Sequence, residues 1–162
     1  MKQKNIILIL FFISFCFPYQ KILIPMDVNQ TNHLKAYGIA YSSLENNSQV
    51  EWLLNYRGGS FLIDLSNKIK KECLLKNVTY KELSIEDISM IYATIEEENM
   101  EIVVLEKTPK IAVYSPPEQQ PWDDAVTLAL TYAEIKYDII FDDEVMTGEL
   151  YQYDWLHLHH ED

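Results

Sequence analysis

The most concentrated group of chemically active side chains is the run His157–Asp162, with the sequence HLHHED. In an extended strand alternate residues share a face, so His157 and His159 point to one side and His160 to the other. Imidazole and carboxylate groups bind metal ions and exchange protons near neutral pH. We therefore predict a catalytic site that contains His157, His159, His160 and Glu161. The pattern names neither a metal nor a cofactor, and the alternative is that these groups satisfy one another in a structural role.

A second polar group follows the apolar run at residues 21–25. It contains Asp27, Asn32 and His33, whose side chains could hydrogen-bond a sugar or the ribose of a nucleotide. We predict that these three residues contact a small polar ligand. The alternative is that they solvate a loop and cap the helix that follows it.

A third group, at residues 55–60 (NYRGGS), has the residue types of an anion-binding turn. Gly58 and Gly59 allow positive φ and a close approach of backbone N–H groups, and Arg57 carries a charge suited to phosphate or carboxylate. The segment matches neither Gly-x-Gly-x-x-Gly nor Gly-x-x-x-x-Gly-Lys-[Ser/Thr]. We predict that Arg57, Gly58 and Gly59 bind the ligand, and the alternative is a tight turn with a solvated Arg.

A fourth group consists of Asp123 and Asp124, which open an expected helix. Acids in the first turn of a helix interact favourably with its dipole, so capping alone can explain them. We also predict them as ligand-binding residues, because they follow the expected strand at residues 110–114.

These four groups lie between segments that alternate between strand and helix patterns. We expect strands at 21–25, 50–56, 78–83, 102–105, 110–114, 137–141 and 155–159, and helices at 31–45, 64–75, 84–97 and 122–135. Strands joined by helices favour a parallel, doubly wound α/β sheet in three layers, whose ligands bind at the carboxyl ends of the strands. A break at Thr108-Pro109 predicts two tandem subdomains, 21–108 and 109–162.

The composition excludes one broad class of function. The chain has 162 residues, 48% of them hydrophobic and 23% charged, which is typical of a globular protein. Its net charge of -12 repels a nucleic-acid backbone or an anionic membrane surface. We therefore expect no nucleic-acid partner.

The first 20 residues have the pattern of a secretory signal peptide. Lys2 and Lys4 precede an apolar run at residues 6–17, which is shorter than the roughly 20 residues of a membrane-spanning helix. We predict export to the periplasm or the extracellular space, with no stable membrane span after cleavage; the alternative is an uncleaved signal anchor. Removal of residues 1–20 leaves Cys73 as the one cysteine, without an intrachain disulfide, and its helical context favours a core position over a catalytic thiol.

Five stretches of the chain carry a resemblance to a known family. They are 22–27 (ILIPMD), 30–38 (QTNHLKAYG), 52–61 (WLLNYRGGSF), 121–130 (PWDDAVTLAL) and 153–162 (YDWLHLHHED). With them the chain resembles exported bacterial proteins labelled "asparagine synthetase B", as an amino-terminal fragment of a longer protein. The part from residue 110 onward is similar to the flavodoxin-like fold of class I glutamine amidotransferases.

Two functional hypotheses follow. A glutamine-dependent asparagine synthetase uses an amino-terminal Cys nucleophile and a Ser-Gly-Gly-x-Asp-Ser loop, and the sequence contains neither. The first hypothesis is therefore an exported α/β domain of this family that lacks asparagine synthetase chemistry and binds a small polar ligand. The alternative is a hydrolase or amidotransferase-like enzyme whose site is completed by residues beyond 162.

Overall fold

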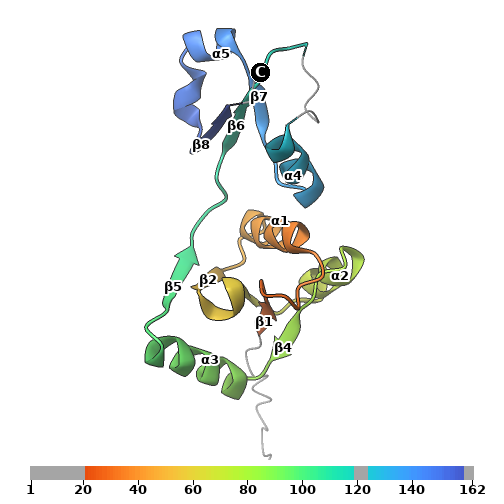
Figure 1. Ribbon diagram of the computed structural model, residues 1–162, viewed down its shortest axis with the longest axis vertical. Helices are drawn as coiled ribbons and strands as arrows, with labels where there is room; N and C mark the ends of the chain where they lie inside the picture. The colour runs from red at the N-terminus through yellow and green to blue at the C-terminus, as the bar shows by residue number, and fades with distance from the viewer. Residues whose placement is uncertain (1–20, 119–123, 159–162) are drawn as a thin grey trace, which may run out of the picture.

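The chain forms two β-sheets with helices packed against them (Figure 1). The computed structural model describes residues 21–118 and 124–158, so the predicted signal peptide lies outside the described residues. The elements are β1 (Lys21–Ile24), α1 (His33–Glu45), β2 (Val50–Leu54), η1 (Tyr56–Gly58), β3 (Ser60–Asp64), α2 (Asn67–Leu75), β4 (Lys81–Leu83), α3 (Ile85–Glu97), β5 (Glu101–Leu105), β6 (Ile111–Tyr114), α4 (Ala125–Ala133), β7 (Asp138–Ile140), α5 (Asp142–Met146), η3 (Glu149–Gln152) and β8 (Trp155–Leu158).

The first sheet has five strands in the order β4-β1-β3-β2-β5, and every neighbouring pair is antiparallel. The expectation of a parallel sheet is therefore wrong for this part of the chain. The reason is β3, which the sequence analysis did not expect. Only residues 55–59 separate β3 from β2, and so short a connection makes two strands antiparallel, whereas parallel neighbours need a crossover of a dozen or so residues.

The segment of β3 was expected to lead directly into a helix from residue 64. Instead α2 begins at Asn67, because the Ser66 side chain caps it by accepting a hydrogen bond from the Ile69 backbone N–H at 3.2 Å. The apolar residues before this cap extend the sheet and pair with both β1 and β2.

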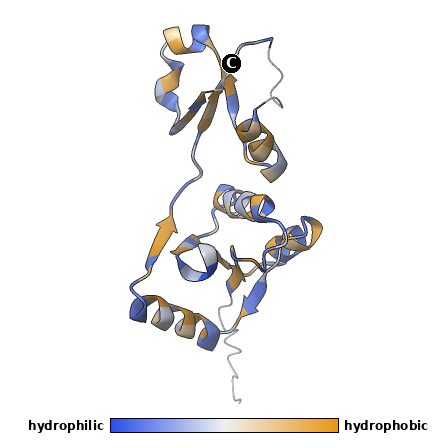
Figure 2. Cartoon of the chain, viewed as in Figure 1, coloured by the Kyte–Doolittle hydropathy of each residue, from blue (hydrophilic) through white to orange (hydrophobic). Residues whose placement is uncertain are grey.

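Both faces of the five-stranded sheet are covered. Ile22, Ile24 and Ile63 pack with buried residues of α1 and α2 on one face. Leu23 and Leu62 point to the other face, where α3 covers them. In Figure 2, α3 carries both blue and orange residues, as expected of a helix with one side packed on a sheet.

The second sheet has three strands in the order β7-β6-β8, and both pairs are parallel. Here the expectation of parallel strands is confirmed. The helix expected at 122–135 is α4, which is capped by Asp124. The short helices α5 and η3, which connect β7 to β8, were not expected from the sequence. The structure as a whole is thus a mixed α/β fold with one antiparallel and one parallel sheet.

Helix α1 of the first sheet packs against α4 of the second. The contact is close at Gly38, where an added Cβ would overlap the carbonyl oxygen of Ala133. Next to it, the Glu134 carboxylate lies 2.7 Å from Lys35 Nζ and 2.8 Å from Lys76 Nζ. A small residue and an ion-pair network therefore hold the two helices together.

Among the described residues, no helix has the length and apolar character needed to cross a bilayer.

Candidate functional site

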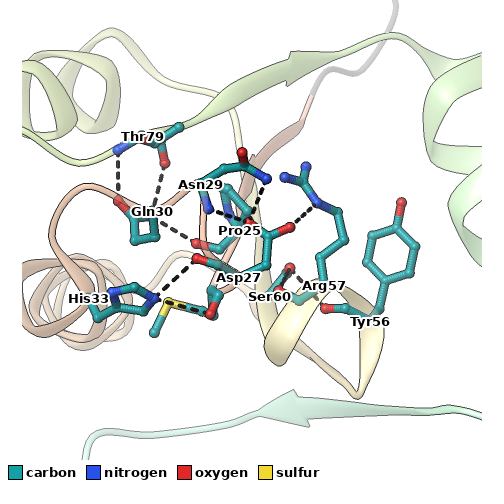
Figure 3. Close-up of polar contacts among 10 residues, drawn as sticks. Pro25, Asp27, Asn29, Gln30, His33, Tyr56, Arg57, Ser60 and Thr79 are labelled. Atoms are coloured by element: carbon teal, nitrogen blue, oxygen red, sulfur yellow. Dashed lines mark hydrogen bonds and ion pairs between the residues drawn. The ribbon is translucent and has the colours of Figure 1, made fainter.

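Two loops that are distant in sequence meet at the end of β1. The backbone N–H of Met26 donates to the carbonyl oxygen of Arg57 at 3.1 Å. The Nε of Arg57 donates to Oδ2 of Asp27 at 2.7 Å (Figure 3). The structure thus joins two groups that the sequence analysis treated separately, the polar loop after β1 and the glycine-containing turn. We call Asp27, Arg57 and His33 the Arg57 cluster.

The turn that carries Arg57 has an unusual backbone. Arg57 itself has φ 47°, and Asn55 before it has φ 65°. Such values are uncommon for non-glycine residues and require support from surrounding structure. Gly58 must be glycine for two reasons. Its φ is 81°, and an added Cβ would lie 2.5 Å from the carbonyl oxygen of Met26. Glycine at this position therefore lets the two loops touch.

The Asp27 carboxylate is held from both sides. Its Oδ1 accepts hydrogen bonds from the backbone N–H and the side-chain amide of Asn29, at 3.0 and 3.1 Å. The hydrogen bond from Arg57 lowers the pKa of Asp27 most, and the bonds from Asn29 lower it further against an opposing effect of burial. Asp27 is therefore an ionised group that positions the guanidinium of Arg57.

His33 and Asn32 begin α1 and have different roles. His33 Nε2 lies 3.2 Å from the carbonyl oxygens of both Met26 and Asp27, so this nitrogen must carry a proton (Figure 3). Asn32 caps α1 by accepting from the Lys35 backbone N–H, and its amide donates to the Tyr132 hydroxyl at 2.7 Å. Asn32 thus caps α1 and links it to α4. This role agrees with the alternative interpretation of Asn32, as a helix cap instead of a ligand contact.

The Gln30 side chain holds this loop in place through several hydrogen bonds. Its buried side chain donates to the carbonyl oxygens of Pro25 and Thr79, at 2.8 and 3.2 Å, and accepts from the backbone N–H groups of Thr79 and Asn32. These bonds tie the loop to the segment before β4. No local sequence signal marks a partner 49 residues away.

A pocket of about 200 Å³ lies beside Arg57. Its lining combines cationic, acidic, hydroxyl and apolar side chains: Leu23, Tyr56, Arg57, Lys81, Leu83, Asp87, Met90, Ile91 and Thr94. Lys81 was missed by the sequence analysis. It reaches the pocket because β4 pairs with β1, with Lys81 opposite Leu23, and only the sheet topology shows that pairing.

A second polar site joins the other two predicted groups. His157 Nε2, on β8, lies 3.0 Å from Oδ2 of Asp124, at the start of α4. Asp124 is 9% exposed and its Oδ1 also accepts from the backbone N–H groups of Val126 and Thr127. Asp124 therefore caps α4 and orients an imidazole at the same time.

Several forces set the charge of Asp124. Burial by itself raises the pKa of this carboxyl group, but the hydrogen bonds from His157 and from the Thr127 and Val126 backbone lower it to about 2. The carboxylate is therefore ionised at neutral pH, which is the state that accepts a hydrogen bond from an imidazole N–H.

The Asp124–His157 pair occupies a particular place in the parallel sheet. Strand β6 is central, and the chain forms β7 on one side of it before β8 on the other. The connection that leaves β6 leads to one side of the sheet, and the connection to β8 returns to the other side. Ligands of open α/β sheets bind near such a reversal of strand order, outside the carboxyl ends of the strands. His157 lies near that end of β8, beside the start of α4.

The remaining predicted site residues lie outside the described residues: Asp123, His159, His160 and Glu161. Within residues 21–118 and 124–158, no group of three metal-ligating side chains comes together. Cys73 is buried in the core, and desolvation raises the pKa of its thiol to about 12. The core interpretation of this cysteine agrees with its burial, since a thiol with so high a pKa is a poor nucleophile.

Comparisons of the chain with family models, with curated proteins and with solved structures find no match. The residues and their geometry are therefore the basis for inferring a function.

Proposed function

We propose that this protein is an exported α/β domain that binds a small polar ligand at the Arg57 cluster. We further propose that it belongs with the exported proteins labelled asparagine synthetase B and lacks asparagine synthetase chemistry. The order β7-β6-β8 supports the proposal that residues 109–162 begin a doubly wound, amidotransferase-like sheet.

The observation that carries the proposal is the way Arg57 is held. Asp27 binds the Nε of the guanidinium, and among the residues described no hydrogen bond engages its two terminal nitrogens (Figure 3). Paired N–H groups of this kind recognise carboxylate and phosphate in a bidentate manner. Lys81 adds a second cation to the same pocket in a protein of net charge -12. The site is suited to the anionic group of a small ligand.

Amide NMR spectra of the full chain, recorded during titration with acetate, test this proposal. We expect shifts in residues that line the pocket, and Arg57→Met should weaken binding by about tenfold or more, since a charge-assisted contact contributes about 1.5–3 kcal/mol. Lys71→Met removes an exposed cation on α2 and serves as the matched control, with binding unchanged.

A second variant separates binding from folding of the turn. Asp27→Asn removes the same ion pair as Arg57→Met but keeps the guanidinium and an amide oxygen that can accept from its Nε–H. If Arg57 binds the ligand, Asp27→Asn retains acetate binding. Equal loss in both variants, or equal binding in Arg57→Met and the unmodified chain, contradicts the proposal.

Export is proposed from the charged and apolar pattern of residues 1–20. Expression of the full chain in a Gram-negative host, followed by cell fractionation and amino-terminal sequencing, tests it. We expect periplasmic protein that begins near Lys21, and cytoplasmic protein with its amino terminus intact contradicts export.

The Asp124–His157 pair supports the alternative, a hydrolase or amidotransferase-like enzyme whose site is completed by residues beyond 162. A buried carboxylate that fixes an imidazole is the arrangement used to orient a general base. The test is ammonia release from glutamine and asparagine by the protein extended past residue 162, since the alternative places part of the site there. This alternative requires release that His157→Gln abolishes, and it is rejected if the extended protein releases none.

A further inference from the structure

The pocket beside Arg57 is lined by both charged and apolar side chains. Arg57 and Lys81 supply positive charge, while Leu23, Leu83 and Ile91 supply apolar surface. These three apolar residues are 2–6% exposed and belong to the core between the sheet and α3. A ligand that fills this pocket therefore meets both charge and hydrocarbon.

The charges in the pocket favour an anion that carries a single charge. Each cation already has a carboxylate partner, at 2.7 Å between Arg57 and Asp27 and 3.1 Å between Lys81 and Asp87. Asp87 itself lines the pocket, so a doubly charged phosphate ester meets more repulsion there than a carboxylate does. The terminal nitrogens of Arg57 can still bind a carboxylate with two parallel hydrogen bonds.

The leucine and isoleucine side chains of the lining disfavour a ligand with many hydroxyl groups. Hydroxyls placed against the leucine and isoleucine side chains would lose their hydrogen bonds to water without replacement, which costs about 1–3 kcal/mol each. The available volume also sets a size. An apolar cavity of about 150 Å³ accepts benzene. A pocket of about 200 Å³ therefore has room for one ring or a short branched chain together with a carboxyl group.

We propose that the pocket binds a small monocarboxylic acid with an apolar body. The carboxylate lies on the terminal nitrogens of Arg57 near Lys81. The body packs on Leu23, Leu83 and Ile91, with Met90 at the rim. This inference rests on the proposed function and narrows its ligand class.

The test compares four probes on the full chain by NMR titration: phenylacetate, acetate, inorganic phosphate and neutral phenylacetamide. We expect phenylacetate to bind about tenfold or more tighter than acetate, because its ring leaves water. Phenylacetamide should bind about tenfold weaker than phenylacetate, because it lacks the charge. Phosphate should bind more weakly than phenylacetate.

Substitutions on the pocket rim locate the apolar contact. Met90 is 62% exposed on α3, so Met90→Ser should leave the fold intact and reduce the preference for phenylacetate over acetate by about threefold. Met146, which is 85% exposed on α5, provides the matched control, and Met146→Ser should leave the preference unchanged.

The outcomes separate this inference from the proposal on which it rests. If acetate binds as tightly as phenylacetate, or phosphate binds more tightly, the inference is overturned while anion binding at Arg57 stands. If Met90→Ser and Met146→Ser reduce the preference equally, the apolar contact is misplaced and the inference is also overturned. If no anion binds, the proposed function fails and the inference fails with it.

Discussion

The antiparallel and parallel sheets of this chain differ in how fully their apolar side chains are covered. Among the described residues, the antiparallel sheet has two clusters of twelve and seven buried residues, one on each face. The parallel sheet has a single cluster of three, Ile111, Val113 and Leu130. Around that smaller cluster, Ile139, Trp155 and Leu158 are 50%, 45% and 63% exposed.

The difference shows how stability is shared between the two sheets. Apolar burial is the main favourable contribution to folding, and it is concentrated in the antiparallel sheet and its three helices. The parallel sheet therefore depends on the contact between α4 and α1, where Gly38 meets Ala133 and Glu134 meets two lysines. The two polar sites follow this division, since the Arg57 cluster lies in the well-packed part and the Asp124–His157 pair in the sparsely packed part.

The largest expected effect comes from a cavity in the antiparallel sheet. Ile63→Ala removes a fully buried side chain and should lower the free energy of unfolding by about 3 kcal/mol. Val113→Ala, at an equally buried site of the parallel sheet, should cost about 1–2 kcal/mol, because fewer methyl groups are lost and the sparse core can relax. Urea denaturation followed by tryptophan fluorescence measures both. Equal losses would remove the contrast between the sheets.

A change of one methyl group tests the contact between the helices. Alanine normally stabilises a helix interior relative to glycine by about 1 kcal/mol. Gly38→Ala should instead destabilise this chain by about 2 kcal/mol, because the added Cβ overlaps the Ala133 carbonyl. Hydrogen exchange should show the loss of protection in α4 and β6 before α1. A stabilised variant would mean that α1 and α4 do not approach this closely.

The Asp124–His157 pair gives a smaller effect that depends on pH. Asp124→Ala should cost about 1–2 kcal/mol at neutral pH through loss of a helix cap. The pKa of Asp124 in the folded chain, about 2, is below the ordinary value of 3.8. Its stabilisation is therefore fully present above about pH 4 and is lost as the pH falls towards 2.

Urea midpoints at several pH values measure this dependence. The difference in stability between Asp124→Ala and the unmodified chain should shrink on acidification. Asp143→Ala, in the first turn of α5, is the matched control at an exposed acid, and its difference should stay small throughout. A constant difference for Asp124→Ala would show that capping by the ionised carboxylate is not the cause.

The smallest effect is expected at the ion pairs between the sheets. Glu134 has a side chain that is 54% exposed, so solvent screens its pairs with Lys35 and Lys76, and Glu134→Gln should cost less than about 1 kcal/mol. The hydrogen bonds from these two lysines lower the pKa of Glu134 to about 2, so the contribution is present above about pH 4.5 and fades below it. Added salt should reduce the difference between the variant and the unmodified chain, and a difference that grows with salt would contradict this account.

Much of the local structure could be predicted from the sequence. The helical spacing of apolar residues located α1 and α3, and Asn32 was among the expected caps. The strands at β1, β2, β5 and β6 were expected from apolar runs. These features depend on neighbours a few residues apart, so a local pattern is sufficient to predict them. The missed strand β3 also had a local signal, since Phe61-Leu62-Ile63 is an apolar run that follows Gly58-Gly59-Ser60.

The candidate sites were only partly predictable. The sequence named Asp27, His33, Arg57, Asp124 and His157, because their residue types and their positions beside strand ends are typical of sites. It could not pair Asp27 with Arg57 or Asp124 with His157, which lie 30 and 33 residues apart. Lys81 had no signal at all, since it enters the pocket through the pairing of β4 with β1.

The amino-acid sequence by itself determined helices α1 to α4, most strands, the acidic charge and the residue types available for chemistry, because each depends on composition or on short-range spacing. Only the tertiary structure decided that one sheet is antiparallel and the other parallel, since strand direction depends on which strands become neighbours. It also decided which polar groups face one another. Hydrogen bonds and ion pairs act over a few ångströms in space, and chain separation sets no such limit.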